Sequence, residues 1–304
     1  MKAPVLYYNA KIFTADDKNL FCDAMIVEGS KIKWVGNQAN IIKSPDKKIN
    51  VQGKRIIPGL IDSHLHPLLL AQIEHNVPCL PPIVNSIEEL KTKLQEKAKS
   101  IKNNKWIEAW GFDESKLKEL RAPNRYDLDE AVSEIPIIVT RTCAHVVAVN
   151  SKALELAGIT KATINPEGGE IERNKDGEPT GVLRESATEL VTKLKPKETI
   201  KEEVDKLVQL SHKMFSKGIV SVTDLYSTVK PDDYYEIFMQ AKESGYKQRT
   251  VLYYRYDNIK NHEIIIPKER LNRENQIYIG GVKVIMDGSV SGQTALTYNS
   301  YLNS

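Results

Sequence analysis

Cysteine is scarce in this chain of 304 residues: Cys22, Cys79 and Cys143 lie far apart, and no Cys-x-x-Cys pair occurs. This pattern argues against a disulfide framework and against a zinc site built from thiolates. The N-terminal residues form no apolar leader segment, and no apolar run approaches the roughly 18 residues of a membrane-spanning helix. We therefore expect a cytoplasmic protein that is neither secreted nor inserted in a membrane.

An excess of charge of one sign is also missing, because 43 lysines and arginines face 40 acidic residues, for a net charge of +3. This balance does not favour nucleic acid or an anionic membrane surface as a partner. Low-complexity tracts are absent, and 41% hydrophobic with 27% charged residues is the composition of a globular chain. The length leaves room for one large domain with an appendage or for two ordinary domains.

Short apolar alternations separated by turn residues fill the first 58 residues and predict a small β module. The stretch from Arg55 to His66 then contains an unbroken apolar run, which predicts a strand buried on both faces, as in parallel sheets. The strands expected in the module are Val5 to Tyr8, Ala24 to Glu28, Ile32 to Gly36 and Ile49 to Gln52.

Helices and strands alternate from about residue 199 onward, which predicts parallel βα units. Thr199 and Glu202 form a capping-box pattern at the start of an amphipathic helix, which Gly218 ends. Its apolar stripe comprises Val204, Leu207, Val208, Leu210, Met214 and Phe215. The elements expected after it are a strand at Ile219 to Thr223, a helix at Asp232 to Ser244, and strands at Thr250 to Tyr256 and Ile277 to Met286.

Residues 75–195 separate these two regions, and we interpret them as an insertion with its own helices and strands. Ser86 and Glu89 predict the start of a helix that runs to Lys102. Gly169 to Arg184 is expected to form a hairpin that turns at Asp176 and Gly177.

Two histidines, separated by a single residue, lie at the end of the first long apolar run. Alternate side chains of a strand share a face, so His64 and His66 can reach the same ion, with Asp62 on that face one step deeper. Imidazole pairs of this kind are typical zinc ligands, and Asp62 is expected to hold a histidine ring or a loop. The alternative is a pair of partly exposed loop histidines, because a lone His-x-His is a weak signal.

Lys283 interrupts an otherwise apolar strand, where an ionised amine is costly unless it is paired, neutralised or modified. A deprotonated lysine amine can take up carbon dioxide, and the resulting carbamate can bridge two metal ions. The alternative is a lysine that extends to the strand end or pairs with Asp287 on the same face.

Seven short segments of the chain together carry a family resemblance. The first is Leu60-Ile-Asp-Ser-His-Leu-His66, preceded by a small β module. The others are Trp110 to Asp113, His145 to Leu154, Gly168 to Glu172, Gly181 to Glu185, Gly218 to Asp224 and Gly281 to Ser289. As a set, these segments resemble the amidohydrolase superfamily of metal-dependent hydrolases, and more narrowly its amidohydrolase family 3 branch, which includes N-substituted formamide deformylase-like enzymes. The resemblance covers nearly the whole chain, and it is specific as a set.

This resemblance implies an α/β fold, a (β/α)8 TIM barrel of which the chain holds only the first four strands. Residues 1–58 would form a small β-sandwich module. Residues 59–74 and 196–304 would form the first half of the barrel, and residues 75–195 a lid subdomain inserted after the first barrel strand.

The resemblance also implies site residues. His64, His66 and Lys283 match metal ligands for one or two divalent ions, with zinc expected, and Lys283 matches a lysine that is carboxylated in many relatives. His145 matches a histidine that we take as a substrate contact or a lid residue, the alternative being a structural histidine near a helix start. For Trp110 and Asp113 we expect lid packing.

The family pattern breaks after the fourth strand, because the remaining metal-binding histidines and the aspartate that acts as general base would follow the fifth, sixth and eighth strands. No catalytic residue is therefore expected within this chain, and His75, His212 and His262 are poor substitutes. Of the 304 residues, the β module accounts for about 60 and the insertion for about 120. The remaining residues, about 120, are half the number that an eight-stranded barrel typically needs. We expect the N-terminal portion of a longer enzyme, or a chain completed by another. Gln293 also replaces an arginine frequent in relatives, which weakens any expectation of an anionic substrate group.

The expected function is a metal-dependent hydrolase that cleaves a C–N bond of an amide, a formamide or a related small molecule with metal-activated water. The alternative is a truncated, non-catalytic half-barrel that needs a partner chain or the missing half. The expected partner is a small-molecule substrate, and the sequence leaves open whether the chain forms a homo-oligomer.

Overall fold

The computed structural model describes residues 3–101, 106–287 and 296–298, which form two compact units. One unit comprises Met1–Asp62 with Met214–Val222, and the other comprises Ser63–Lys213 with Thr223–Ser304. The division of the chain into a β module, a half-barrel and an inserted lid stays a prediction. Within the described ranges, none of the helices combines the length and the hydropathy needed to span a bilayer.

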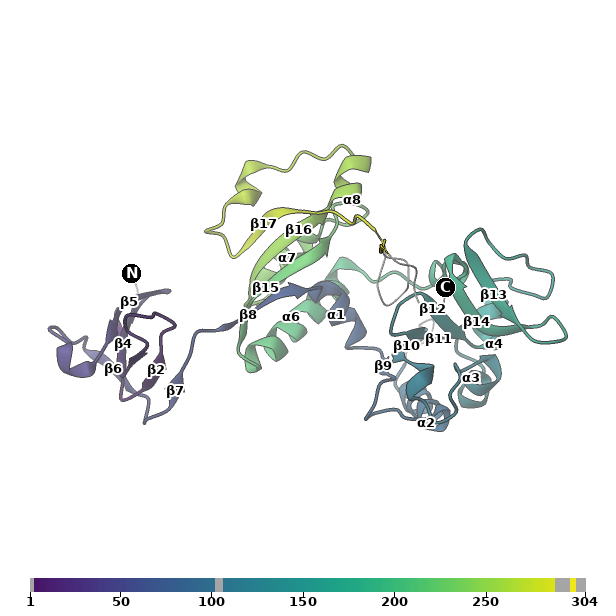
Figure 1. Ribbon diagram of the computed structural model, residues 1–304, viewed down its shortest axis with the longest axis horizontal. Coiled ribbons are helices and arrows are strands. Elements are labelled where there is room, and N and C mark those ends of the chain that lie inside the picture. The colour runs from purple at the N-terminus through teal and green to yellow at the C-terminus, as the bar shows by residue number, and fades with distance from the viewer. Residues whose placement is uncertain (1–2, 102–105, 288–295, 299–304) are drawn as a thin grey trace. The chain divides into compact units, whose positions relative to one another are not determined.

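Two small sheets form the N-terminal module (Figure 1). In the first, β1 (Val5–Tyr8) pairs antiparallel with β4 (Ala24–Glu28) and parallel with β6 (Lys47–Asn50), and β5 (Lys31–Gly36) lies at the edge. The second has the order β3 (Phe21–Cys22), β2 (Lys11–Phe13) and β7 (Arg55–Ile56). Three predicted strands are confirmed. The fourth begins and ends two residues early, because Gln52 and Gly53 both adopt positive φ angles in a turn.

A six-stranded sheet organises the insertion, with the order β13-β14-β12-β11-β10-β9. The antiparallel hairpin of β13 and β14 and its turn at Gly177, where φ is +82°, are confirmed. The strands are β9 (Val77–Pro78), β10 (Ile107–Phe112), β11 (Ile137–Arg141), β12 (Val146–Val149), β13 (Gly169–Arg173) and β14 (Pro179–Glu185). The helices are α2 (Ile87–Ala98), α3 (Arg125–Ala131), α4 (Ser151–Leu156), α5 (Glu189–Thr192) and the 3-10 turns η2 (Glu114–Lys116) and η3 (Ser186–Thr188).

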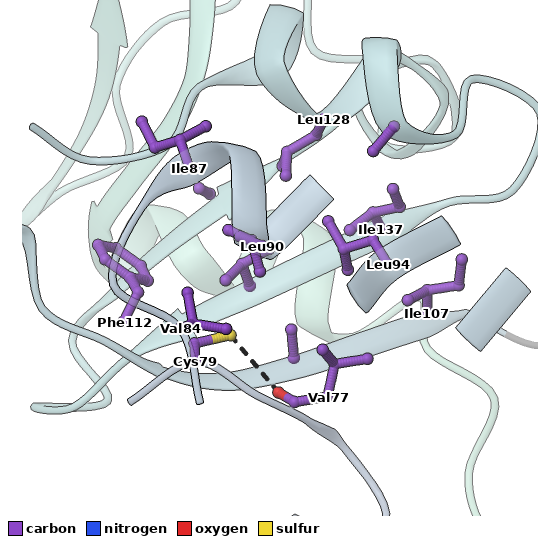
Figure 2. Close-up of a cluster of buried hydrophobic side chains, with 14 of the residues drawn as sticks. Val77, Cys79, Val84, Ile87, Leu90, Leu94, Ile107, Phe112, Leu128 and Ile137 are labelled. Atoms are coloured by element: carbon purple, nitrogen blue, oxygen red, sulfur yellow. Dashed lines mark hydrogen bonds between the residues drawn. The ribbon is translucent and has the colours of Figure 1, made fainter. Parts of the chain in front are cut away.

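Two apolar clusters pack on this sheet. Figure 2 shows the first, in which Ile87, Leu90 and Leu94 of α2 meet Leu128 of α3 and the buried side chains of the sheet. In the second, residues of α4 and α5 pack with Ile138, Val147 and other buried strand residues. The buried positions of α2 recur at helical spacing, and Ser86 accepts a hydrogen bond from the amide of Glu89 at 3.2 Å, so the predicted helix start is confirmed.

The region expected to form half of a barrel contains a four-stranded sheet with the order β17-β16-β15-β8. Strands β16 and β17 are parallel, as predicted, and no closed barrel is present among the described residues. The strands are β8 (Leu60–Leu65), β15 (Ile219–Ser227), β16 (Arg249–Arg255) and β17 (Ile277–Lys283). The helices are α1 (Pro67–Ile73), α6 (Ile200–Ser216), α7 (Tyr234–Glu243), α8 (Tyr256–Asn261) and the 3-10 turn η4 (Lys268–Leu271).

Two expectations about burial are wrong. Strand β8 is not buried on both faces, because the neighbouring side chains of Leu60 and Ile61 point to opposite faces and are 51% and 69% exposed. In α6, the buried stripe contains Val204, Leu207, Leu210 and Met214, but Phe215 is exposed near the end of the helix. The capping box at its start is confirmed, since Thr199 and Glu202 each accept the other's backbone N–H.

Candidate active site

The two predicted histidines lie where β8 passes into α1. His64 is the second-to-last residue of the strand, and His66 precedes Pro67, the first residue of the helix. Proline is well suited to that position, since its missing N–H has no partner at a helix start anyway. The two rings contact edge to face, with centroids 5.4 Å apart and planes at 80°.

The carboxylate of Asp224 holds His66 from strand β15. Its Oδ1 lies 3.2 Å from Nδ1 of the ring. Oδ1 also accepts the backbone N–H of Tyr226 at 2.9 Å, and Oδ2 accepts the hydroxyl of Ser227 at 2.9 Å. The side chain of Asp224 is 1% exposed, so these donors replace the water that a buried carboxylate loses.

Tyr226 and Arg255 extend the set of contacts around His66. The ring of Tyr226 contacts His66 edge to face, with centroids 5.6 Å apart. Arg255, the last residue of β16, donates from Nη1 to the hydroxyl of Tyr226 at 2.8 Å, and its guanidinium lies 4.8 Å from the centre of that ring. Hydrogen bonds to Asp257 raise the pKa of Arg255 further above its usual value, so the guanidinium stays charged.

Lys283 ends strand β17 and is the register partner of Arg255 on β16. The expectation of a lysine in the middle of an apolar strand is wrong, because β17 ends three residues before Met286 and Lys283 is only half-buried. Its head group can therefore reach the strand end without full desolvation. Asp287, the partner considered for it, accepts a hydrogen bond from the amide of Leu296 at 2.9 Å.

The ends of β8, β15, β16 and β17 meet at one end of the sheet. Asp224 contacts His66, Arg255 contacts Tyr226, and Arg255 is the register partner of Lys283. Sequence reasoning gave no role to Asp224, Tyr226 or Arg255. Asp224 lies in one of the segments that carry the family resemblance. In parallel α/β folds functional side chains gather at the carboxyl ends of strands, and this rule could have pointed to the other two.

His145 lies in the insertion, just before β12, and its Nδ1 is 2.9 Å from Oε2 of Glu185. Both side chains are 61% exposed, and Glu185 adopts a strained backbone with φ at +50°. Asp113 caps the turn η2 by accepting the amide and hydroxyl of Ser115, and these bonds lower the pKa of its carboxyl. These bonds give Asp113 a local capping role, and lid packing stays a prediction for it.

A pocket of about 370 Å³ lies between residues of α1, the start of α6 and the insertion, and Trp110 is among its lining residues. Glu203 lines it and accepts a hydrogen bond from Gln72 at 3.3 Å. Burial, followed by the nearby carboxylates of Asp232 and Glu198, raises the pKa of Glu203 to about 7. This pocket thus contains a carboxyl group whose pKa is raised to about 7.

The donor set fits part of a metal site. His64 and His66 offer imidazole nitrogens, which suit zinc and similar ions. Within the described ranges, however, no group of three or more His, Cys, Asp or Glu residues is arranged to hold a metal. His75, His212 and His262 are exposed, and His262 bonds to the carbonyl of Asn258. Gln293 and the loop after Asp287 lie outside the described residues.

Comparison with known proteins gives three informative similarities. Residues 47–304 match the model of a family described as "Amidohydrolase family". The N-substituted formamide deformylase of Arthrobacter pascens is 31% identical over 248 residues, which are 79% of this chain and 45% of that protein. The putative amidohydrolase YtcJ of Bacillus subtilis (strain 168) is 28% identical over 312 residues, 99% of this chain and 57% of that protein.

The fold is also similar to that of a solved protein, an uncharacterized metal-dependent hydrolase from Pyrococcus horikoshii OT3. The TM-score is 0.68 at 21% identity, over 97% of this chain and 57% of that one. The chain thus spans about half the length of the relatives that it matches.

Proposed function

The chain belongs to the amidohydrolase family, and from this premise we propose that it provides the first half of the active site of a metal-dependent hydrolase. His64, His66 and Lys283 would hold one or two divalent ions, with Lys283 as a carbamate. When bound, such an ion lowers the pKa of water and polarises the scissile carbonyl.

The observation that carries this proposal is the arrangement around His66. Its Nδ1 faces a buried carboxylate, and its ring lies edge to face with His64. Both histidines stand at a strand end beside the ends of three other strands, the usual place of active sites in parallel α/β folds. His145 is proposed as a substrate contact whose ring Glu185 orients.

The finer proposal is hydrolysis of a C–N bond in an amide, a formamide or a related small molecule, with zinc as the metal. It is supported by the likeness to an N-substituted formamide deformylase. A (β/α)8 barrel, a small-molecule substrate, a cytoplasmic location and a homo-oligomer belong to the same proposal. The family match disfavours the alternative of a non-catalytic half-barrel.

Metal binding by the purified chain tests the proposal. We expect cobalt or zinc titration, followed by absorbance or calorimetry, to show an affinity that His64→Ala and His66→Ala each reduce by more than about 100-fold, the upper range for losing a ligand's supporting partner. His262→Ala, an exposed histidine that bonds to a backbone carbonyl, is the matched control and should bind like the wild type. Equal binding by all four proteins would overturn the assignment.

A further inference from the structure

We propose that Asp224 is a positioning residue for His66: its carboxylate fixes the imidazole with the proton on Nδ1 and the lone pair on Nε2, ready for a metal ion. This inference rests on the proposed function only for the identity of the ligand. The orientation of the ring can be tested without metal.

The geometry restricts the ring at two points. Asp224 and His66 are 158 residues apart in the chain, and Oδ1 and Nδ1 are 3.2 Å apart. The ring of Tyr226 lies against the imidazole at a centroid distance of 5.6 Å. A hydrogen bond on one nitrogen and an aromatic ring beside it together limit rotation about the χ angles of His66.

The carboxylate itself is fixed before it meets the histidine. The amide of Tyr226 donates to Oδ1 and the hydroxyl of Ser227 donates to Oδ2, each at 2.9 Å, and the side chain is almost completely buried. Moving the carboxylate of Asp224 would leave a buried charge without these hydrogen-bond donors, which is strongly unfavourable. The oxygen that faces His66 is therefore held at a defined position.

The chemistry then decides the tautomer. A neutral imidazole has one N–H and one lone pair, and an ionised carboxylate can only accept. The proton must lie on Nδ1 to form the 3.2 Å contact, so Nε2 keeps its lone pair. Metal-binding histidines are commonly oriented in this way by a carboxylate on the other ring nitrogen.

A purely local role for Asp224 is the competing explanation, since the bonds to Tyr226 and Ser227 also shape the end of β15. Two variants separate the roles. Asp224→Asn keeps the size of the side chain but replaces a charged acceptor by an amide, whereas Ser227→Ala removes a hydrogen bond within β15 and leaves the contact with His66.

The experiment is ¹⁵N NMR of the His66 ring in the metal-free chain, at a pH where the ring is neutral, combined with cobalt titration. We expect the Nδ1–H tautomer in the wild type and in Ser227→Ala. In Asp224→Asn we expect a mixture with the other tautomer and a 10–100-fold loss of cobalt affinity. Backbone amide spectra of each variant establish that it is folded.

Three results overturn the inference: an Nε2–H tautomer in the wild type, an unchanged tautomer and affinity in Asp224→Asn, or equal losses in Asp224→Asn and Ser227→Ala. If Asp224→Asn does not fold, the wild-type tautomer still decides the question. If the wild-type chain binds no cobalt, the proposed function fails in this chain, and the tautomer still confirms or refutes the positioning role.

Discussion

Arg255 and Lys283 are register partners at the carboxyl ends of the neighbouring parallel strands β16 and β17. Arg255 forms an ion pair with Asp257, which accepts from Nε and Nη2, and it donates from Nη1 to the hydroxyl of Tyr226. An anionic group on Lys283 would be attracted by the charged guanidinium of its register partner, and the carboxylate of Asp257 offsets part of this attraction. This attraction is one physical reason for the carbamate that we propose on Lys283.

Carboxylation of Lys283 is therefore expected in the presence of bicarbonate and a divalent metal. Carbon dioxide adds to the neutral amine to form an N–C bond, and the proton released goes to solvent. The ¹³C NMR spectrum in labelled bicarbonate should show a carbamate signal in the wild type that Lys283→Arg lacks. Lys260→Arg, on α8, is the control and should keep the signal. A signal that persists in Lys283→Arg would place the carbamate elsewhere.

Gly181→Ala should destabilise the insertion by about 2 to 4 kcal/mol, from overpacking and backbone strain together. Its φ is +89°, and a Cβ there would overlap the carbonyl oxygen of Val149 and lie 2.9 Å from Cβ of Arg125. Gly158→Ala is the matched control, because its φ is +64° but no atom lies within 4 Å of an added Cβ. It should cost only about 1 to 2 kcal/mol. Urea dependence of amide hydrogen exchange in strands β11 and β12 measures both, and equal effects would contradict the overlap.

Asn150→Ala should cost about 2 to 4 kcal/mol, since it leaves several buried backbone groups without partners. The fully buried Asn150 accepts from the amides of Ile137 and Ala153 and donates to the carbonyls of Val132 and Ile135. Lys152→Ala, on the same helix, removes only a surface ion pair and should change stability by less than about 0.5 kcal/mol. The same exchange measurement applies, and a small effect of Asn150→Ala would show that water replaces its bonds.

Glu203 should make stability fall as the pH rises from about 4.5 to about 7. Its pKa is raised from 4.5 to about 7 by burial and then by Asp232 and Glu198, so in this range the native state holds a proton that the unfolded chain has released. Above pH 7 both states have lost it, and the slope ends. In Glu203→Gln this slope should disappear, with urea midpoints equal to the wild type near pH 4 and higher at pH 8.

Asp205→Asn, an exposed position on the same helix, is the control for Glu203→Gln and should leave the pH slope in place. Parallel pH profiles for the wild type and Glu203→Gln would show that the carboxyl titrates in its ordinary range. The two variants differ in burial and share the helix, so the comparison isolates the effect of the pocket.

The sequence by itself determined the local features: the starts of α2 and α6, the hairpin of β13 and β14, and the pair His64 and His66. Capping patterns, turn glycines and periodicity depend on residues within a few positions of one another, so a short stretch of chain contains all the information they need. The family could also be identified from the sequence, because the segments that carry the resemblance are short and contiguous.

Only the tertiary structure decided the environment of these residues. That Asp224 faces His66, that Arg255 stands beside Lys283, and that Lys283 ends its strand half-buried all depend on strand order and register. The exposure of Leu60 and Ile61 on β8, likewise, depends on which parts of the chain cover the two faces of that strand. Such contacts join residues far apart in the chain, and hydrophobic patterning limits which strand faces are buried without fixing which strand lies beside which.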